Sequence, residues 1–115
     1  MNLKLFLILF LFTVLTNGCQ KKQNLVESNF TFADSQLRYA LQETEAVREK
    51  VEGKLYNPRT LDPKGNLKLV APGDWTSGFF PGELWYMYEY TGNEYWRQKA
   101  EEFTAPIERE KTNGR

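Results

Sequence analysis

Three stretches of the chain carry the spacing of apolar and polar residues that is typical of helices. The first runs from Phe32 to Glu52, where apolar or small residues recur at steps of three and four and charged residues take the opposite side. Thr31 with Asp34 three residues later has the form of a capping box, and Gly53 is a suitable end. The pattern predicts an amphipathic helix with one buried stripe.

The second and third patterns follow each other closely and predict an antiparallel helical hairpin. The second runs from Phe79 to Tyr90, with Pro81 in the first turn and Gly92 just past the end, and its rings point in nearly all directions. A helix of this kind is expected to be buried on several sides. The third begins after an N-cap at Asn93 and runs toward Lys111, with Pro106 expected to kink or end it. A pair made of an inner helix that is apolar nearly all round and an outer amphipathic helix is the unit of a layered helical toroid or solenoid.

A long connection rich in turn residues joins the first helix to the second. Between Lys54 and Gly73 it carries three prolines and the turn sequence 62–66, and a brief extended segment is expected at 67–70. Long connections are often functional, although an inert surface excursion is the alternative.

The N-terminus has the order of a bacterial export signal. Lys4 precedes a largely apolar run from Leu5 to Leu15, which as a helix is about 16 Å long and so too short for a stable membrane span. Gly18 followed directly by Cys19 is similar to a lipobox, although the third position before the cysteine is Thr16. We expect a signal peptide at 1–18, lipid attachment to Cys19 and a polar tether at 19–29. The protein would then be exported and anchored to a bacterial membrane, facing the periplasm or the cell surface; soluble export and an uncleaved anchor are the alternatives.

Composition excludes some classes of function. The 15 basic and 15 acidic side chains cancel, so no overall field favours nucleic acid as a partner. With one cysteine and no histidine, a metal cluster on several thiols is excluded, Ser77 lacks a partner for nucleophilic catalysis, and no metal or cofactor is expected. Ten of the 17 aromatic residues fall between residues 75 and 103, which is more than so short a chain is expected to bury. We therefore expect residues 30–115 to be part of a larger domain.

The aromatic loop and the residues after it resemble the N-terminal signature of the unsaturated glucuronyl hydrolases, glycoside hydrolase family 88. The similarity covers residues 30–115 and includes Asn57-Pro58-Arg59 upstream and Ala100, Phe103 and Thr104 downstream. The signature itself is Asp74-Trp75-Thr76-Ser77-Gly78-Phe79-Phe80-Pro81-Gly82, then Leu84-Trp85 and Tyr88-Glu89-Tyr90-Thr91-Gly92.

The resemblance implies an all-α fold, in which residues 30–115 supply about three helices of an (α/α)6 barrel. It also implies hydrolysis of oligosaccharides left by polysaccharide lyases, including products of glycosaminoglycan breakdown. An aspartic acid protonates the 4,5-double bond of the terminal unsaturated uronate, water adds at C5, and the resulting hemiketal opens. None of Asp34, Asp62 and Asp74 lies in the Asp-x-Gly-Phe-like context of the family's first catalytic aspartate. No catalytic residue is therefore assigned, and the 115-residue chain by itself is expected to be inactive.

Two positions match substrate contacts of the family. Trp75 corresponds to the indole that stacks on the sugar next to the cleaved bond, and Phe79 to a ring near the unsaturated uronate. The alternative for both is a place in the core. Asp74 is expected to cap a helix, and Trp85, Trp96 and Tyr88 are expected to be core residues because they lie on helical stripes.

A different class of function is a non-catalytic helical lipoprotein that binds glycans or proteins through a tetratricopeptide-like surface. The hairpin around Gly92, with Tyr95 and Ala100, has the form of one such repeat. No second copy follows at a spacing near 34 residues, which weakens this alternative.

Overall fold

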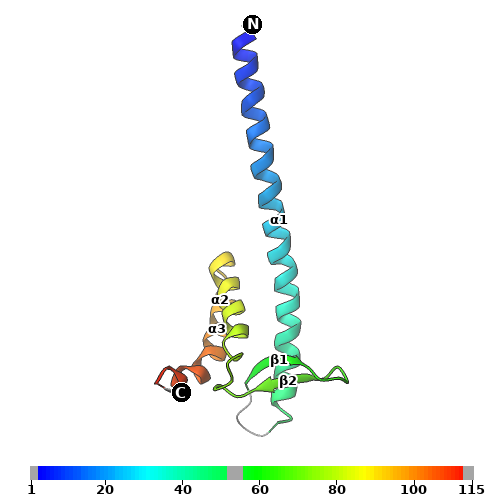
Figure 1. The fold of residues 1–115 in the computed structure, drawn as a ribbon, viewed down its shortest axis with the longest axis vertical. Helices are drawn as coiled ribbons and strands as arrows, with labels where there is room; N and C mark the ends of the chain where they lie inside the picture. Colours follow the sequence, from blue (N-terminus) through cyan, green and yellow to red (C-terminus); the bar gives the residue numbers. More distant parts are fainter. Residues whose placement is uncertain (1–2, 52–55, 113–115) are drawn as a thin grey trace. The chain divides into compact units, whose positions relative to one another are not determined.

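The computed structural model describes residues 3–51 and 56–112, with side chains described from residue 24 onward. The chain divides into two compact units, residues 1–35 and residues 36–115. Its elements, drawn in Figure 1, are α1 (Leu3–Arg48), β1 (Asn57–Leu61), β2 (Leu67–Val70), α2 (Phe79–Thr91), α3 (Glu94–Thr104) and the 3-10 helix η1 (Ala105–Thr112).

Helix α1 begins much earlier than the sequence pattern predicts. It is continuous from Leu3, and the Thr31 hydroxyl donates to the carbonyl of Glu27 at 2.9 Å, a bond made within a helix. The predicted capping box at Thr31 is therefore wrong. Residues 19–29, expected as a tether, also lie within α1, whereas the side chain of Cys19 is outside the described residues. In the part of the chain that the structure describes, no helix has both the length and the apolar character needed to cross a bilayer.

The end of α1 falls at Arg48, a few residues before the predicted end at Glu52. Glu52 and Gly53 lie outside the described residues, as do residues 54 and 55 at the start of the predicted connection.

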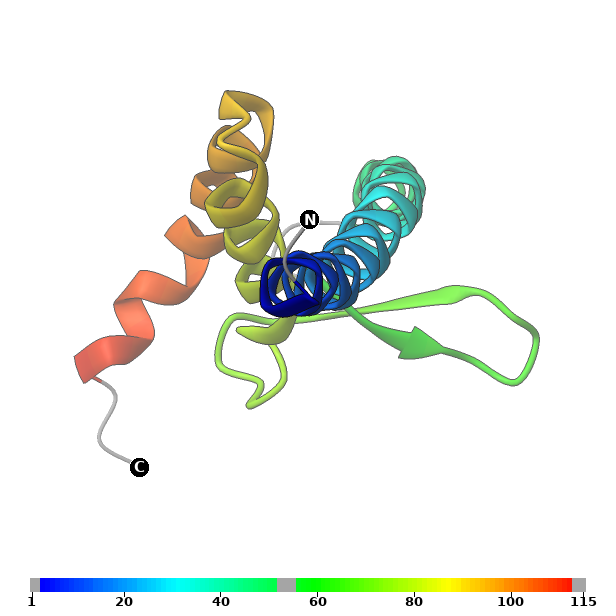
Figure 2. The same cartoon turned by 90° about the horizontal axis from the view of Figure 1, so that it is seen from above.

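A β-hairpin occupies most of the connection between α1 and α2, and Figure 2 shows it as an extended ribbon. Its turn is held by Asp62, whose Oδ1 accepts from the backbone N–H groups of Lys64 at 2.8 Å and Asn66 at 2.9 Å. Gly65 has φ +83°, a left-handed conformation that glycine adopts without a steric penalty. The extended segment predicted at 67–70 is confirmed as β2, and β1 is an addition to the prediction.

Helices α2 and α3 lie side by side, and their connection follows the predicted caps (Figure 1). Gly92 ends α2 with φ +64°, and its N–H donates to the carbonyl of Tyr88 at 2.8 Å. Asn93 caps α3, because its side-chain oxygen accepts from the N–H of Tyr95 at 3.0 Å. The predicted antiparallel hairpin is confirmed.

Proline marks the start of α2 and the end of α3. Pro81 is buried in the first turn of α2, where a missing N–H leaves no helical hydrogen bond unmade. Helix α3 ends at Thr104, and the chain continues through Pro106 as η1. The predicted break at Pro106 is confirmed.

The core of residues 36–115 is built around the packed pair α2 and α3, and the end of α1 and β2 also contribute buried apolar side chains. Phe80 and Phe103 meet edge to face with ring centroids 5.1 Å apart. Burying one such side chain stabilises the fold by about 1.5–3 kcal/mol. The other buried apolar residues are Leu41, Leu69, Val70, Leu84, Met87, Trp96 and Ala100. The described chain is thus mainly helical around a helical core, which confirms the all-α class and agrees with the first helices of an (α/α)6 barrel.

Ion pairs join the C-terminal part of α1 to α3. The Lys99 ammonium lies 2.8 Å from the Glu45 carboxylate, and Arg48 lies 3.1 Å from Glu102. The hydrogen bond to Glu45 and the neighbouring Glu102 raise the pKa of Lys99, with burial opposing them. Pairs this exposed contribute about 0–1 kcal/mol each. They therefore contribute little to the stability of the fold compared with the apolar core.

Helix α2 is buried along one face only within the described chain. Trp96 of α3 is fully buried as predicted, but Trp85 is 37% exposed and Tyr88 is half-buried, so the core prediction is wrong for Trp85 and only partly met by Tyr88. Tyr86 and Tyr90 are exposed as well. The aromatic surplus of the sequence therefore lies on the surface of this chain.

Candidate functional site

Trp75 and Phe79 lie together at the junction of the connection and α2. Trp75 is in the loop before the helix and Phe79 is its first residue, and their ring centroids are 6.0 Å apart at an interplanar angle of 85°. Trp75 is 78% exposed and Phe79 is 63% exposed. The described chain thus places neither ring in its core, and both present apolar surface to solvent. A role in substrate contact stays a prediction.

Asp74 organises the loop on the N-terminal side of Trp75. Its Oδ1 accepts from the backbone N–H of Thr76 at 2.8 Å and from the Thr76 hydroxyl at 2.6 Å. Its Oδ2 lies 3.1 Å from Nη1 of Arg59. The bonds from Thr76, and then the charge of Arg59, hold the pKa of Asp74 below its ordinary value of 3.8. The predicted cap is wrong: the N-cap of α2 is Gly78, and Asp74 instead closes an Asx turn around Trp75.

Ser77 ties down the other side of the loop. It is 3% exposed, and its hydroxyl donates to the carbonyl of Pro72 at 2.7 Å. A buried hydroxyl engaged in this way braces the loop and is not presented to a substrate. The side chains of Asp74 and Ser77 thus hold a short loop from which Trp75 projects.

Arg59 reaches this loop from a bulge in β1. Pro58 and Thr60 are opposite consecutive residues of β2, so Arg59 between them has no partner across the ladder. A bulge of this type redirects the side chain of the extra residue. Sequence periodicity gave no signal for the bulge, although Arg59 belongs to the segment that carries the family resemblance.

A groove of about 470 Å³ is lined in part by Phe79 and lies between the C-terminal part of α1, the hairpin and the start of α2. Glu83, one turn after Phe79 on α2, lines the same groove. Although Glu83 is exposed as a whole residue, local desolvation of its carboxyl group raises its pKa above the ordinary value of 4.5. Glu83 therefore keeps its proton to a higher pH than an ordinary glutamate does. Its spacing of four residues from Phe79 could have indicated this position from the sequence.

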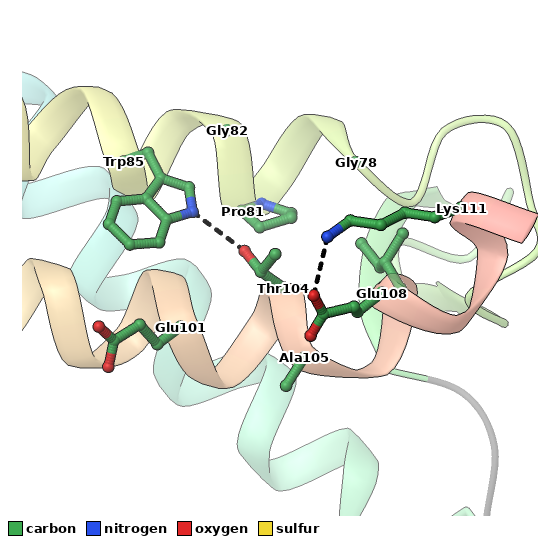
Figure 3. A pocket seen from close by; sticks show the side chains of 10 residues that line it. Gly78, Pro81, Gly82, Trp85, Glu101, Thr104, Ala105, Glu108 and Lys111 are labelled. Carbon is green, nitrogen blue, oxygen red and sulfur yellow. Dashed lines mark hydrogen bonds and ion pairs between the residues drawn. The ribbon is translucent and has the colours of Figure 1, made fainter.

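A larger groove of about 510 Å³ lies between α2, the end of α3 and η1, and Figure 3 shows its lining. The indole N–H of Trp85 points across it and donates to the Thr104 hydroxyl at 3.0 Å, and the Lys111 ammonium lies 2.8 Å from Glu108 (Figure 3). The Glu108–Lys111 pair is exposed, and the Thr104 hydroxyl is engaged by the Trp85 indole and by the carbonyl of Ala100. This groove includes neither Trp75 nor Phe79, so its size does not make it the candidate site.

The described carboxylates of the hairpin and loop are engaged in structural hydrogen bonds. Asp62 accepts from Asn66 and from neighbouring backbone N–H groups, which lowers its pKa. Asp74 is held as described above. Both groups stay ionised at acidic pH and so are poorly suited to donate a proton. Among residues 3–51 and 56–112, no three histidine, cysteine, aspartate or glutamate side chains form a group that could hold a metal ion.

Comparison with known proteins gives similarity to one kind of enzyme. The chain is 52% identical over 59 residues to an unsaturated glucuronyl hydrolase of Formosa agariphila, a match that covers 50% of this chain and 15% of that protein. It is 44% identical over 43 residues to an unsaturated glucuronyl hydrolase of Bacillus sp. strain GL1, covering 37% of this chain and 11% of that protein. No family model matches the chain.

One solved structure is also similar to part of the chain. The crystal structure of an unsaturated glucuronyl hydrolase specific for heparin aligns with 65% of this chain and 20% of its own, at 33% identity and a TM-score of 0.45. The chain thus spans a minor part of the length of each relative. The resemblance to unsaturated glucuronyl hydrolases that the signature predicts is confirmed at the level of sequence similarity.

Proposed function

We propose that this chain is part of an unsaturated glucuronyl hydrolase, a glycoside hydrolase acting on oligosaccharides that end in a 4,5-unsaturated uronate. The observation that carries the proposal is the exposed pair Trp75 and Phe79, held on a braced loop in a chain similar to such enzymes. The sequence similarity supports the class of reaction, and the loop supports a place for the substrate.

In this proposal Trp75 and Phe79 contact sugar. A ring face covers the C–H face of a pyranose well, and a loop can project such a ring into a binding site. In the edge-to-face contact the indole plane lies nearly perpendicular to the ring of Phe79. Trp75 stacks on the sugar next to the cleaved bond, and Phe79 lies near the unsaturated uronate.

The proposed reaction needs one carboxyl group that first donates and later accepts a proton. A carboxylic acid protonates the 4,5-double bond, water adds at C5, and the resulting hemiketal opens and releases the remaining oligosaccharide. Asp62 and Asp74 are unsuited to this role because both are engaged and have lowered pKa values. We assign the acid to neither, and we propose that the 115 residues alone do not catalyse the reaction.

We also propose export and membrane attachment through lipid on Cys19. The support is the order of residues 1–19, with one charge, an apolar run and a small residue before the cysteine. Acyl chains contribute about 0.8 kcal/mol of membrane affinity per buried methylene. Cys19→Ser is expected to move the protein from the membrane fraction to the soluble fraction after carbonate washing. Unchanged membrane association of Cys19→Ser would exclude this attachment.

Activity is tested on the product of the native gene, read to its stop codon. Unsaturated disaccharides from chondroitin or heparin lyase digestion lose their ultraviolet absorbance when the double bond is hydrated. We expect this loss with the gene product and no loss with the purified 115-residue chain. A gene product that binds these disaccharides without turnover would favour the non-catalytic binding alternative.

A further inference from the structure

The side chains of Arg59, Asp74 and Thr76 form a continuous series of contacts around Trp75. Arg59 projects from the β1 bulge, its guanidinium meets Oδ2 of Asp74 at 3.1 Å, and Oδ1 of Asp74 accepts both hydrogen bonds from Thr76. Asp74 and Thr76 are the two chain neighbours of Trp75. The backbone of Trp75 is therefore closed into a turn whose central carboxylate is held from outside by Arg59.

This series of contacts joins β1 to the loop before α2, two segments that are separate in the sequence. Arg59 lies 15 residues before Asp74, and the intervening chain includes the hairpin turn and β2. Without the ion pair, the Asx turn is still closed by Thr76, but nothing among the described contacts of the Asp74 carboxylate fixes it to the hairpin. The bulge supplies that connection at the cost of one position in the ladder.

The exposure of the two partners limits what the ion pair can contribute. The Arg59 side chain is 43% exposed and that of Asp74 is 22% exposed, so the pair is partly screened by water. Such a pair contributes little to global stability. Its effect is local, because it restricts the orientation of one short loop that carries the most exposed tryptophan of the described chain.

We propose that Arg59 is a positioning residue that holds the indole of Trp75 in its binding orientation through Asp74. The inference rests on the proposed function for its effect on substrate, since Trp75 is the residue proposed to stack on sugar. Arg59 itself does not touch the substrate in this proposal. Loss of Arg59 leaves the chemistry intact and makes productive stacking on Trp75 rarer.

The experiment has one readout on the loop and one on the reaction. Nuclear magnetic resonance on ¹⁵N-labelled protein gives heteronuclear NOE values for the Trp75 indole N–H, assigned with Trp75→Phe, and for the Thr76 amide. Steady-state kinetics on the unsaturated disaccharide gives KM and kcat. The variants are Arg59→Gln, Arg59→Lys and Asp74→Asn, with Lys68→Gln on β2 as the matched loss of an exposed positive charge from the same hairpin.

We expect lower NOE values at both sites in Arg59→Gln, a KM raised about 2- to 5-fold as for an exposed pair, and an unchanged kcat. Arg59→Lys keeps the NOE values and the KM close to those of the wild type, because the observed contact uses one nitrogen. Asp74→Asn keeps an oxygen for Thr76 and behaves like Arg59→Gln, and the double variant is no worse than either single one. Lys68→Gln behaves as wild type.

Wild-type NOE values in Arg59→Gln would overturn the proposal, whether or not KM changes. A raised KM with unchanged loop signals would mean that Arg59 contacts the substrate directly. If the wild-type product of the native gene shows no turnover, the proposed function fails, and the NOE comparison still decides whether Arg59 positions Trp75.

Discussion

Trp75 and Phe79 meet edge to face at 6.0 Å although both rings are largely exposed. An exposed apolar pair on a protein surface is unfavourable in free energy unless another molecule or element covers it, because both rings keep most of their area in water. The structure adds a loop braced by Ser77 and Asp74, so the pair is presented in a defined orientation. The proposed stacking of a sugar on Trp75 relies on this combination.

Phe79→Leu removes the ring that supports the indole while it keeps an apolar side chain at the start of α2. We expect a raised KM, because Trp75 loses its edge-to-face partner, which is worth about 0.5–1.5 kcal/mol when buried and less here. The double variant Phe79→Leu/Trp75→Ala should lose less kcat/KM, in free-energy terms, than the sum of the losses of the two single variants, since the residues are in contact. Tyr86→Leu, an exposed ring on the same helix, is the control. Strictly additive losses would show that the two rings act separately.

Two glycines of the helical hairpin should respond to alanine in opposite directions. Gly92 has φ +64°, and Gly92→Ala should destabilise the protein by about 1 kcal/mol because a side chain is strained there. Gly82 lies inside α2, and an added Cβ would meet nothing within 4 Å. Gly82→Ala should therefore stabilise the protein by about 0.5–1 kcal/mol. Thermal unfolding followed by circular dichroism measures both, and equal shifts for the two variants would contradict the cap geometry.

Glu83 should make the free energy of unfolding depend on pH, in a direction set by the desolvation of its carboxyl group. Because its pKa is raised above 4.5, the folded chain keeps this proton to higher pH than the unfolded chain does. The free energy of unfolding therefore falls as pH rises from about 4.5 through the folded pKa, and it stays lower above that range. Glu83→Gln removes this loss, so its advantage in Tm over wild type should be small at pH 4 and larger at pH 7.

The control for this titration is Glu89→Gln, which removes a charge from another exposed position of the same helix. A Glu83→Gln advantage that is the same at both pH values would show that the carboxyl is not desolvated in the folded protein.

The helical hairpin could be predicted from the sequence because its signals are local. Gly92 and Asn93 adjoin and have opposite backbone requirements, so together they mark the end of one helix and the start of the next. Thr31 shows the limit of the same rule: its hydroxyl can cap a helix or bond back to Glu27 within one, and the neighbouring sequence does not decide between them.

The contacts that define the candidate site depend on residues far apart in the chain. Trp75 and Phe79 could be identified through the family resemblance, whereas the role of Asp74 could not, since its partner Arg59 reaches it from a bulge. The prediction that Trp85 lies in the core is wrong because a helical stripe indicates which side chains share a face and not whether another element covers that face. Long-range pairing of this kind leaves no periodic signal.

The most direct test of the account is the kcat/KM of Trp75→Ala on an unsaturated uronic disaccharide, compared with the wild-type gene product. Trp75 is 78% exposed, so its removal should leave Tm nearly unchanged. The account predicts a loss of about 1–3 kcal/mol of stabilisation, or about 5- to 150-fold in kcat/KM, as for ring-on-ring stacking. A kcat/KM equal to that of the wild type, with the same Tm, would contradict it.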